Sequence, residues 1–388
     1  MNILRIVYDF PPPWRGLSPG TYELTKAQAE LGNEVVVLCG GWPRRKSYSE
    51  KNLRAVRLLS ALPKIGIILT YAPAVLFSLL RLTRIYKFDL IHGHNFSPLF
   101  YHLARKMGMK RKDPYILHMH ITTAGRWRQS SPKVGFWTRL EWVLHRFSER
   151  IGCQVADNII CVSESVREEV QRFYKADPKK VLVISNGVNT KLFTPNGQKA
   201  QVEGMDEEKD IIILFVGVLR ERKNLENLIL ALQFLEKRYK LLVVGTAQEK
   251  WYYRNILRMA REKALLDRVF FLGYIPYHEL PSYYRLADVL VLPSHYEGSP
   301  KVVLEALASG VPAVVSRGYQ ADRYLESLVH RVEGNNPEET AQVIQEVTKK
   351  KGDVDVQVVR EKYGWPKVAG QIQDVYSDVL FRSGQQEG

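Results

Sequence analysis

Short apolar runs alternate with longer amphipathic segments in both halves of the chain. In the first half, Ile3–Tyr8 is a run of strand-forming residues, a helix-like segment follows it, and Glu34–Leu38 is a second such run. In the second half, Ile211–Val216, the segment NLENLILALQFL and Leu241–Val244 repeat this order. The succession of strand, helix and strand is typical of parallel α/β sheets.

Further apolar runs predict strands that are buried on both faces. They are Asp89–His92, Tyr115–His118, Asn158–Val162, Val181–Ile184, Val269–Leu272, Val289–Leu292 and Ala313–Ser316. A chain of 388 residues is too long for one ordinary compact domain and fits two. We therefore expect an α/β fold with two doubly wound, Rossmann-like domains that face a central cleft. Ligands of open parallel sheets bind at the carboxyl ends of the strands, so we expect the active site in that cleft.

The domain boundary is predicted near residues 190–209. The segment TPNGQKAQVEGMDEEKD in this range is polar, contains glycine and has no apolar period, as is typical of a linker. Residues 1–190 are assigned to an N-terminal, acceptor-side domain and residues 191–365 to a C-terminal, donor-binding domain. A last helix within 366–388, roughly Pro366–Phe381, is expected to cross back to the first domain.

The positive charge is concentrated in one quarter of the chain. The net charge is +15, and residues 51–150 contain 18 Lys and Arg against 4 Asp and Glu. A local basic surface favours an anionic partner, such as a phospholipid face, a phosphate-bearing acceptor or nucleic acid. The alternative explanation is a solvated surface that is rich in Lys and Arg and binds no particular partner. Among the anionic partners, we do not expect nucleic acid.

Two segments in or near this quarter are candidates for membrane contact. Residues 65–82 have about the minimum length for a span, but they contain Pro73 and end in basic residues, so we expect a buried or interfacial helix rather than a span. Residues 125–150 mix three tryptophans with six Arg or Lys. Such a segment suits a membrane interface, but a core-facing tryptophan stripe explains it equally well.

The cysteines and the N-terminus indicate the compartment. Cys39, Cys153 and Cys161 lie in or beside apolar runs without metal-ligand spacing, which predicts buried, inert thiols in a reducing compartment. The segment MNILRIVYDFPPP alternates like a strand and does not have the pattern of a signal peptide. We expect a cytoplasmic protein. Peripheral attachment to the inner membrane face is compatible with this expectation.

A predicted helix after Ser294 carries the most specific local pattern. Ser299 is expected to N-cap it, Pro300 suits its first position, Gly310 fits the position after its end, and Pro312 prevents its continuation. Such a helix begins just after a strand end, where its N–H groups and positive dipole end favour a diphosphate.

Two carboxylates flank the start of this helix. Glu297 lies just before it and Glu305 within it. Carboxylates accept hydrogen bonds from vicinal hydroxyls such as those of ribose or a hexose. Taken alone, each glutamate is explained as well by a solvated or capping role.

Several motifs, in their order and spacing, resemble those of retaining GT-B-fold glycosyltransferases of family 4 (glycosyl transferases group 1). The resemblance extends over most of the chain. Its motifs are Glu297–Pro300 with Glu305–Pro312, Asn186–Asn189, Phe215–Gly217 with Lys223–Asn224, Ala287–Asp288, Leu292–Ser294, Val162–Glu164 and Tyr363–Trp365.

The resemblance implies roles for particular residues. Glu297 would contact the transferred sugar, Glu305 the ribose and Lys223 the diphosphate. His120 would stand beside the donor sugar, and His120 and Glu297 are the expected catalytic residues. A fixed cation such as Lys223 also stabilises the charge that develops on a departing nucleoside diphosphate. Apart from the resemblance, His92, His94 and His118 cluster near strand ends; His94 is a candidate for lining the acceptor side, whereas His118 is expected to be structural. The other donor-binding residues expected are Gly16, Gly20, Arg220, Gly298, Ser299, Pro300, Lys301 and Val302.

Three departures from the family pattern concern the phosphates of the donor. Val218 stands where the family often has arginine, and Arg220 or Arg222 is a candidate to supply that charge. The Gly16–Gly20 loop lacks adjacent glycines, and the stretch after Ser316 lacks the usual Gly-Gly turn.

The predicted function is transfer of a hexosyl or N-acetylhexosaminyl group, with retention of configuration, from a UDP- or GDP-sugar. The acceptor is expected to be lipid-linked, a glycolipid or a polysaccharide. Because members usually need no metal, no metal and no cofactor are expected. The alternatives are a nucleotide-sugar epimerase of similar fold and a non-catalytic basic binding protein.

Overall fold

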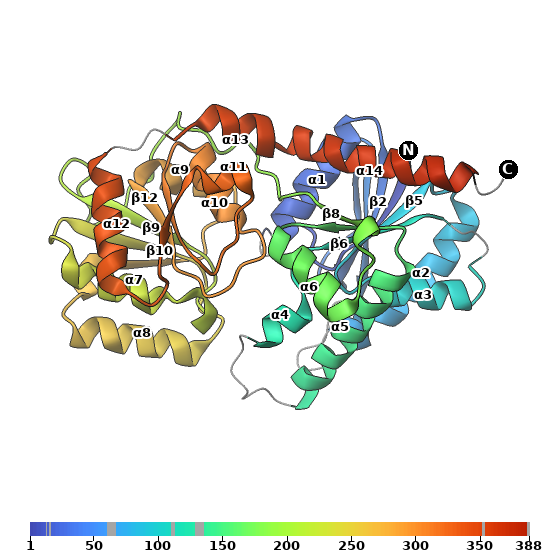
Figure 1. Cartoon of the computed structure of the whole chain (residues 1–388), viewed down its shortest axis with the longest axis horizontal. Coiled ribbons are helices and arrows are strands. Elements are labelled where there is room, and N and C mark those ends of the chain that lie inside the picture. Colours follow the sequence, from blue (N-terminus) through green and yellow to red (C-terminus); the bar gives the residue numbers. More distant parts are fainter. Residues whose placement is uncertain are drawn as a thin grey trace. The chain divides into compact units, whose positions relative to one another are not determined.

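The computed structural model describes residues 1–12, 14, 17–59, 67–109, 113–128, 136–350 and 354–385. The chain divides into two compact units (Figure 1), which are 1–185 with 365–388, and 186–364. The sequence places this boundary a few residues later, between 190 and 191, and starts the returning segment at 366 rather than 365.

Unit 1 contains an eight-stranded sheet with the order β3-β4-β2-β1-β5-β6-β7-β8. Its neighbouring strands are parallel except for the β3–β4 pair. The strands are β1 (Asn2–Ile6), β2 (Glu34–Trp42), β3 (Tyr48–Glu50), β4 (Leu53–Leu59), β5 (Leu90–His94), β6 (Tyr115–Met119), β7 (Asn158–Cys161) and β8 (Val181–Val183). The strand order reverses between β1 and β5, which is where open α/β sheets bind ligands.

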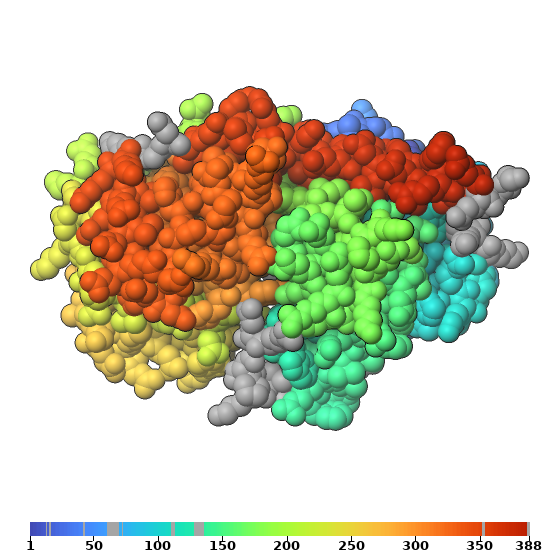
Figure 2. Space-filling view, in the orientation of Figure 1, coloured from blue at the N-terminus to red at the C-terminus, as the bar shows by residue number. Residues whose placement is uncertain are grey.

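Helices cover both faces of this sheet. The apolar side chains of α1 (Ser18–Glu30) and α14 (Trp365–Gln385) form one core with the sheet. The other core is formed with α2 (Ile67–Ile85), α3 (Pro98–Lys106), α5 (Phe136–Val155) and α6 (Glu164–Tyr174), and α4 (Thr123–Arg128) contacts α5 and α6. The last helix, α14, therefore belongs to the same unit as the N-terminus, and it lies as a continuous band on the surface of unit 1 (Figure 2).

Unit 2 contains a six-stranded parallel sheet with the order β11-β10-β9-β12-β13-β14. The strands are β9 (Ile211–Val216), β10 (Tyr239–Val244), β11 (Val269–Gly273), β12 (Val289–Leu292), β13 (Ala313–Ser316) and β14 (Val329–Val332). The helices α7 (Leu225–Ala231), α8 (Lys250–Glu262) and α12 (Pro337–Lys349) share one core with the sheet. The helix α10 (Lys301–Ala308) packs against α9 (Leu280–Leu286) and α13 (Val356–Tyr363), and α11 (Arg323–Glu326) is a single turn. The strand order reverses between β9 and β12.

The structure confirms the predicted fold class, and a strand lies at each predicted position. Three strands were missed: β3, β4 and β14. Each lies at or next to an edge of its sheet and mixes charged with apolar residues, so its sequence lacks the continuous apolar run that marks the central strands.

The structure also bears on the start of α1, the cysteines and the question of a membrane-spanning helix. The prediction of a loop up to Gly20 is wrong, because α1 begins at Ser18 and Pro19 suits its first turn. The three cysteines are free and buried, as predicted. Within the described ranges, no helix is both long enough and apolar enough to cross a bilayer.

Candidate functional site

Three charged side chains meet at the carboxyl ends of β9 and β12 in unit 2. Lys223 closes a 3-10 turn after β9, and Glu297 lies in the loop after β12. The Lys223 ammonium donates to Glu297 Oε1, and Arg222 Nη1 lies 3.6 Å from Glu297 Oε2. Lys223 and Glu297 are both 7% exposed. One buried carboxylate is thus held between two cations, which leaves the cluster with an excess of positive charge.

Backbone contacts fix the two loops against each other. Asn224 has a left-handed φ of 52°, and its Nδ2 donates to the Pro293 carbonyl at 3.2 Å and also to the Gly334 carbonyl. The N–H of His295 donates to the carbonyl of Arg222 at 2.9 Å. The meeting of Lys223 and Glu297 is therefore determined by the backbone and not only by their flexible side chains.

The protonation states of the pair depend on each other. Burial favours a higher pKa for Glu297, but the Lys223 ammonium and then the Arg222 guanidinium outweigh burial and hold that pKa below its ordinary value. Burial lowers the pKa of Lys223 because it disfavours the charged form, and Glu297 offsets only part of this effect. Removing Glu297 would leave the buried Lys223 ammonium without its carboxylate, and removing Lys223 would leave the Glu297 carboxylate with Arg222 alone.

Glu305 lies on α10 and is oriented by a buried tyrosine. It is 5% exposed, and its Oε2 accepts a hydrogen bond of 2.8 Å from the Tyr284 hydroxyl of α9. Burial raises the pKa of Glu305, although Lys301 and the Tyr284 hydrogen bond act in the opposite direction. Tyr284 packs edge-on against Phe193, with ring centroids 5.6 Å apart. The Glu305 carboxyl is thus anchored by a packed aromatic pair.

The start of α10 differs from the prediction. The helix begins at Lys301 and its N-cap residue is Pro300, with an extended ψ of 112°, so the predicted cap at Ser299 and first helical position at Pro300 are wrong by one residue. Asn186 Nδ2 donates to the Ser299 carbonyl at 2.8 Å and so holds this approach to the helix. Gly310 follows the helix with a φ of 76°, as predicted.

Two glycines allow the backbone of these loops to approach closely. A Cβ on Gly245 would stand 1.8 Å from the carbonyl oxygen of Gly217, in the loop that leads to Lys223. A Cβ on Gly318 would stand 2.3 Å from the carbonyl oxygen of His295. The carbonyl of Gly318 in turn accepts the N–H of Glu297 at 3.2 Å. Gly318 therefore supports Glu297 from a stretch that lacks the adjacent glycines typical of the family.

The other predicted donor-binding residues of unit 2 lie near this cluster. Gly298 is buried between Glu297 and the start of α10, and Lys301 and Val302 form the half-buried first turn of α10. Arg220 precedes the 3-10 turn, and its charge contributes to the lowered pKa of Lys223. Of the two arginines proposed to replace the one missing at Val218, Arg222 is the one 3.6 Å from the Glu297 carboxylate.

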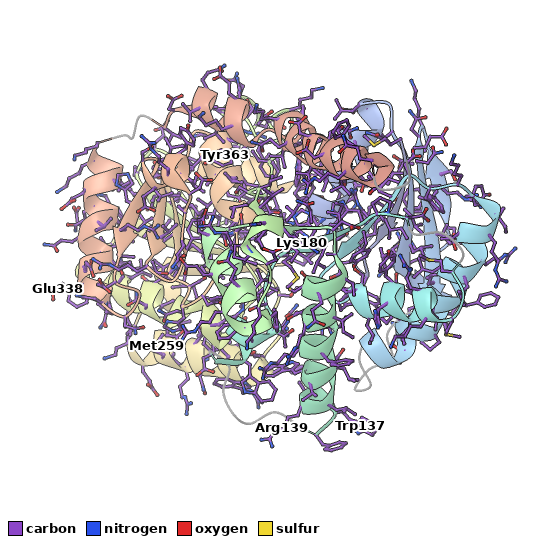
Figure 3. All side chains as sticks on the ribbon, turned by 45° about the vertical axis from the view of Figure 1, so that its right-hand side comes forward. Trp137, Arg139, Lys180, Met259, Glu338 and Tyr363 are labelled. Carbon is purple, nitrogen blue, oxygen red and sulfur yellow. The ribbon has the colours of Figure 1, made fainter. Side chains whose placement is uncertain are left out.

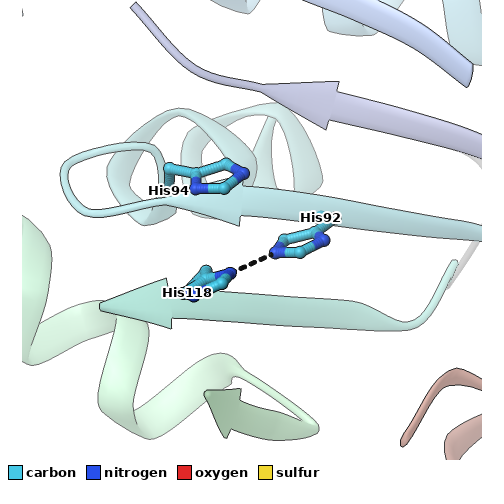
Figure 4. A group of neighbouring side chains, drawn as sticks. All are labelled: His92, His94 and His118. Carbon is cyan, nitrogen blue, oxygen red and sulfur yellow. Dashed lines mark hydrogen bonds between the residues drawn. The ribbon is translucent and has the colours of Figure 1, made fainter. Parts of the chain in front are cut away.

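Four histidines lie together at the carboxyl ends of β5 and β6 in unit 1, and Figure 4 shows three of them. His94 of β5 is in register with His118 of β6. His92 Nε2 lies 3.2 Å from His118 Nδ1, and His94 Nδ1 lies 2.9 Å from His120 Nε2. Burial holds the pKa of His92, His94 and His118 well below the ordinary value, so these rings are neutral at pH 7.

The predicted site residues of unit 1 differ in burial and position. His120 directly follows β6 and is half-buried. His94 is only 1% exposed, so in this arrangement its side chain does not line an open surface, as the acceptor-side role requires. Gly20 lies in the first turn of α1, and Gly16 lies outside the described residues.

Asn95 contacts the candidate residue His120, and the sequence did not reveal this contact. Its φ is 45°, and its Oδ1 accepts the N–H of His120 at 2.9 Å. The only local signal is an asparagine directly after a strand, at a place where asparagine tolerates a left-handed backbone.

Among the described residues, one group of side chains is close enough to share a metal ion. It consists of His92, His94 and His118, one nitrogen of each lying within 4.8 Å of the others.

Comparison with known families covers both units. The model "Glycosyltransferase Family 4" matches residues 14–192, and the model "Glycosyl transferases group 1" matches residues 197–363. An uncharacterized glycosyltransferase of Methanocaldococcus jannaschii is 28% identical over 408 residues, which span 99% of this chain and 100% of the relative.

Two solved structures extend the comparison. Sucrose-phosphate synthase from Thermosynechococcus elongatus has a TM-score of 0.81 at 22% identity, covering 98% of this chain and 99% of its own. Anabaena HepE, crystallised with UDP and glucose, has a TM-score of 0.72 at 17% identity, covering 97% and 100%. At these identities the structures show a shared fold alone.

Proposed function

Because the chain belongs to glycosyltransferase family 4 (glycosyl transferases group 1) and has the GT-B fold, we propose that it transfers a hexosyl or N-acetylhexosaminyl group from a UDP- or GDP-sugar. The proposed acceptor is lipid-linked, a glycolipid or a polysaccharide, and the anomeric configuration is retained. In this proposal unit 2 binds the donor.

The arrangement of Glu297, Lys223 and Arg222 carries this proposal. Two cations around one carboxylate leave an excess positive charge at the carboxyl ends of β9 and β12. The amino end of α10 follows Glu297 in the same loop, and its N–H groups and dipole favour anions. Such a cluster suits the diphosphate of a nucleotide sugar and stabilises the negative charge that develops as the nucleoside diphosphate departs.

The remaining roles follow the family pattern. Glu297 is proposed to contact the transferred sugar and Glu305 the ribose hydroxyls, because the Glu305 carboxyl is held by Tyr284 and has further acceptor positions. His120, with Glu297, is proposed to act at the reacting centre. HepE was crystallised with UDP and glucose, which supports a uridine nucleotide as the first donor to test.

A basic and aromatic surface on α5 motivates a membrane-associated acceptor. Phe136, Trp137 and Phe147 are exposed large apolar side chains on this helix. Figure 3 shows Trp137 and Arg139 near the amino end of α5, pointing away from the ribbon. A groove of about 230 Å³ between α5 and α6 adds two arginines beside apolar side chains, being lined by Val143, Arg146, Phe147, Arg150, Phe173 and Tyr174. Anionic lipid suits such a surface, so we propose a cytoplasmic protein that binds the inner membrane face.

A thermal-shift panel tests the donor. A ligand that binds only the folded chain raises its Tm by mass action. We expect UDP, GDP or one of their sugars to raise the Tm of the wild type, and Lys223→Met to abolish most of that shift. A panel in which no nucleoside diphosphate or nucleotide sugar shifts the Tm contradicts the proposal.

Two controls address the rest of the proposal. The epimerase alternative predicts conversion of the nucleotide sugar without any acceptor, whereas transfer requires one. Because we propose that no metal takes part, EDTA is expected to leave the transfer rate unchanged. A rate that falls with EDTA and returns with a divalent ion overturns that part.

A further inference from the structure

A buried chain of polar side chains crosses the core of unit 1 toward the strand ends. Arg5 of β1 and Gln28 of α1 lie at its inner end, where Arg5 donates to Gln28 Oε1 and Gln28 Nε2 donates to the Tyr376 hydroxyl at 3.0 Å. The Tyr376 hydroxyl of α14 is hydrogen-bonded to His92 Nδ1, and His92 Nε2 meets His118 Nδ1. Elements from the start and the end of the sequence thus converge on the histidines.

The partners of His92 determine which of its nitrogens carries the proton. Arg5 Nη2 lies 3.4 Å from His92 Nδ1, and a guanidinium can only donate. His92 Nδ1 is therefore the acceptor, so its proton is on Nε2 and is donated to His118 Nδ1. His118 in turn carries its proton on Nε2.

His120 is held by two neighbouring residues at the end of β5. The ring nitrogen of His94 reaches His120 Nε2 at 2.9 Å, and Asn95 Oδ1 accepts the His120 N–H. The His120 ring also stacks on His118, with centroids 4.4 Å apart and planes at 10°. Both the backbone and the ring plane of His120 are thereby fixed from the buried side.

The same rings are poorly arranged for a metal ion. The rings of His92, His94 and His118 are stacked, with interplanar angles of 9°, 11° and 18°. His92 Nε2 and His118 Nδ1 already face each other at 3.2 Å, so a metal ion would have to break that contact. Both nitrogens of His92 are already engaged, one of them beside the cationic Arg5.

We propose that His94 and Asn95 are positioning residues for His120, and that the chain Arg5–Tyr376–His92–His118 holds His92 and His118 in one tautomeric state, with the His120 ring stacked on His118. This inference rests on the proposed function in one respect only, namely that His120 takes part in transfer. A structural role alone would stabilise the fold without selecting one orientation and tautomer of the His120 ring.

Nitrogen NMR of the full chain, labelled with ¹⁵N-histidine, tests the coupling without any substrate. Long-range ¹H–¹⁵N spectra report the tautomer of each ring, and His120→Gln identifies the His120 signals. We expect one tautomer for His120 in the wild type and averaged, shifted signals in His94→Leu. His94→Asn places an amide where Nδ1 stood and is expected to restore a single set of signals. Unchanged His120 signals in His94→Leu overturn the proposal.

Asn95→Gly provides a second variant that keeps the fold, because glycine readily adopts the left-handed backbone of Asn95. It removes only the acceptor for the His120 N–H, and we expect a change in the His120 signals here too. One equivalent of zinc bound by the wild type, with loss of the His92, His94 and His118 signals, would contradict the proposal in favour of a metal site.

Kinetics separate this inference from the proposed function. With a transferase assay in hand, His94→Leu is expected to lower kcat by about 10–100-fold, because misplacing a reacting group costs up to about that much. KM for the donor is expected to change by less than about threefold, since donor binding is assigned to unit 2, and His94→Asn to recover most of kcat. Full transfer by His120→Ala would refute the role of His120, while the NMR result would still decide whether His94 positions it. An equal loss in His94→Leu and His94→Asn overturns the positioning role.

Discussion

Glu297 and Lys223 are buried together as an ion pair, so the loss of one leaves the other less well compensated. We expect Lys223→Met to lower the free energy of unfolding by about 3–5 kcal/mol, because it leaves the buried carboxylate with Arg222 alone. The double variant K223M/E297Q is expected to recover most of this loss, since neither member of the pair remains. Urea denaturation followed by tryptophan fluorescence measures both. If the loss of unfolding free energy in the double variant equals the sum of the losses in Lys223→Met and Glu297→Gln, the two residues are not a coupled pair.

Glu305 gives the donor site a predicted dependence on pH. Because burial raises its pKa, the carboxylate is lost on acidification at a higher pH than for an exposed glutamate. We expect the affinity for a nucleotide sugar to fall as pH decreases from 7 toward the ordinary glutamate value of 4.5. Glu305→Gln is expected to weaken binding at pH 7 by roughly 10–100-fold, the value of hydrogen bonds to a charged group, and to remove this acidic limb.

Tyr284→Phe is the matched control for that prediction. The Tyr284 hydroxyl lowers the pKa of Glu305, so its removal moves the acidic limb to higher pH. Calorimetric titrations with a nucleotide sugar, carried out across pH on the wild type, Glu305→Gln and Tyr284→Phe, measure the position of this acidic limb. An acidic limb unaffected by both substitutions excludes Glu305 as its origin.

At the residue scale, the sequence predicts candidate site residues through motif resemblance but not their contacts. Glu297 and Lys223 are far apart in the chain, and nothing local predicts that they form an ion pair. Arg222 was only one of two candidates, and Asn95 was missed because its role depends on the register of β5 and β6. The predicted N-cap at Ser299 is off by one residue. A Ser-Pro pair before a helix fits a serine cap followed by proline in the first turn, and it fits equally well a helix that begins after the proline.

At the element scale, α14 completes a core of unit 1. Its buried residues include Trp365, Val368, Ile372, Tyr376 and Val379. Burial of one such side chain contributes about 1.5–3 kcal/mol, so together they reach the whole stability of a typical domain, about 5–15 kcal/mol. We expect a chain that ends at Gly364 to be insoluble or to lose cooperative unfolding. Circular dichroism and thermal scans measure this.

A chain that ends at Ser383 is the control, because it keeps these buried residues. It is expected to unfold like the full chain. Native-like unfolding of the chain ending at Gly364 would refute the role assigned to α14.

The central strands were predictable because strands buried on both faces appear as continuous apolar runs, such as Ile211–Val216 and Val289–Leu292. The first turn of α1 was not predictable, because Pro19 and Gly20 are residue types more typical of loops than of helices. The contact of α14 with α1 depends on tertiary pairs such as Gln28 with Tyr376, which a single sequence does not display.

At the scale of the whole molecule, the buried histidines make stability sensitive to acid. His92, His94 and His118 have folded-state pKa values well below 6.5, mainly because of burial. The unfolded chain therefore binds more protons than the folded chain below pH 6.5, and stability is lost as pH falls through this window. Each fully shifted group contributes about 1.4 kcal/mol per pH unit. We expect a lower Tm at pH 5 than at pH 7, and a smaller difference in His118→Gln; an equal difference contradicts the prediction.

Membrane attachment is also a prediction at this scale. We expect the chain to float with anionic liposomes at low salt and to be released by salt, which screens the basic surface. Trp137→Ser is expected to weaken flotation. Trp251→Ser on α8 of unit 2 is the control, because Trp251 is 48% exposed and Trp137 52%. Equal flotation of both variants contradicts a surface centred on α5.

The central claim is that Lys223, Glu297 and Glu305 bind a nucleotide sugar whose sugar is transferred. Its most direct test follows radiolabelled sugar from UDP- and GDP-sugars into lipid and polysaccharide acceptors of a membrane extract. We expect transfer by the wild-type chain and about a hundredfold less by Glu297→Gln, because Glu297 is proposed to contact the transferred sugar and misplacing a reacting group can cost about that much. Full transfer by that variant, or acceptor-independent conversion of the donor by the wild type, would contradict it.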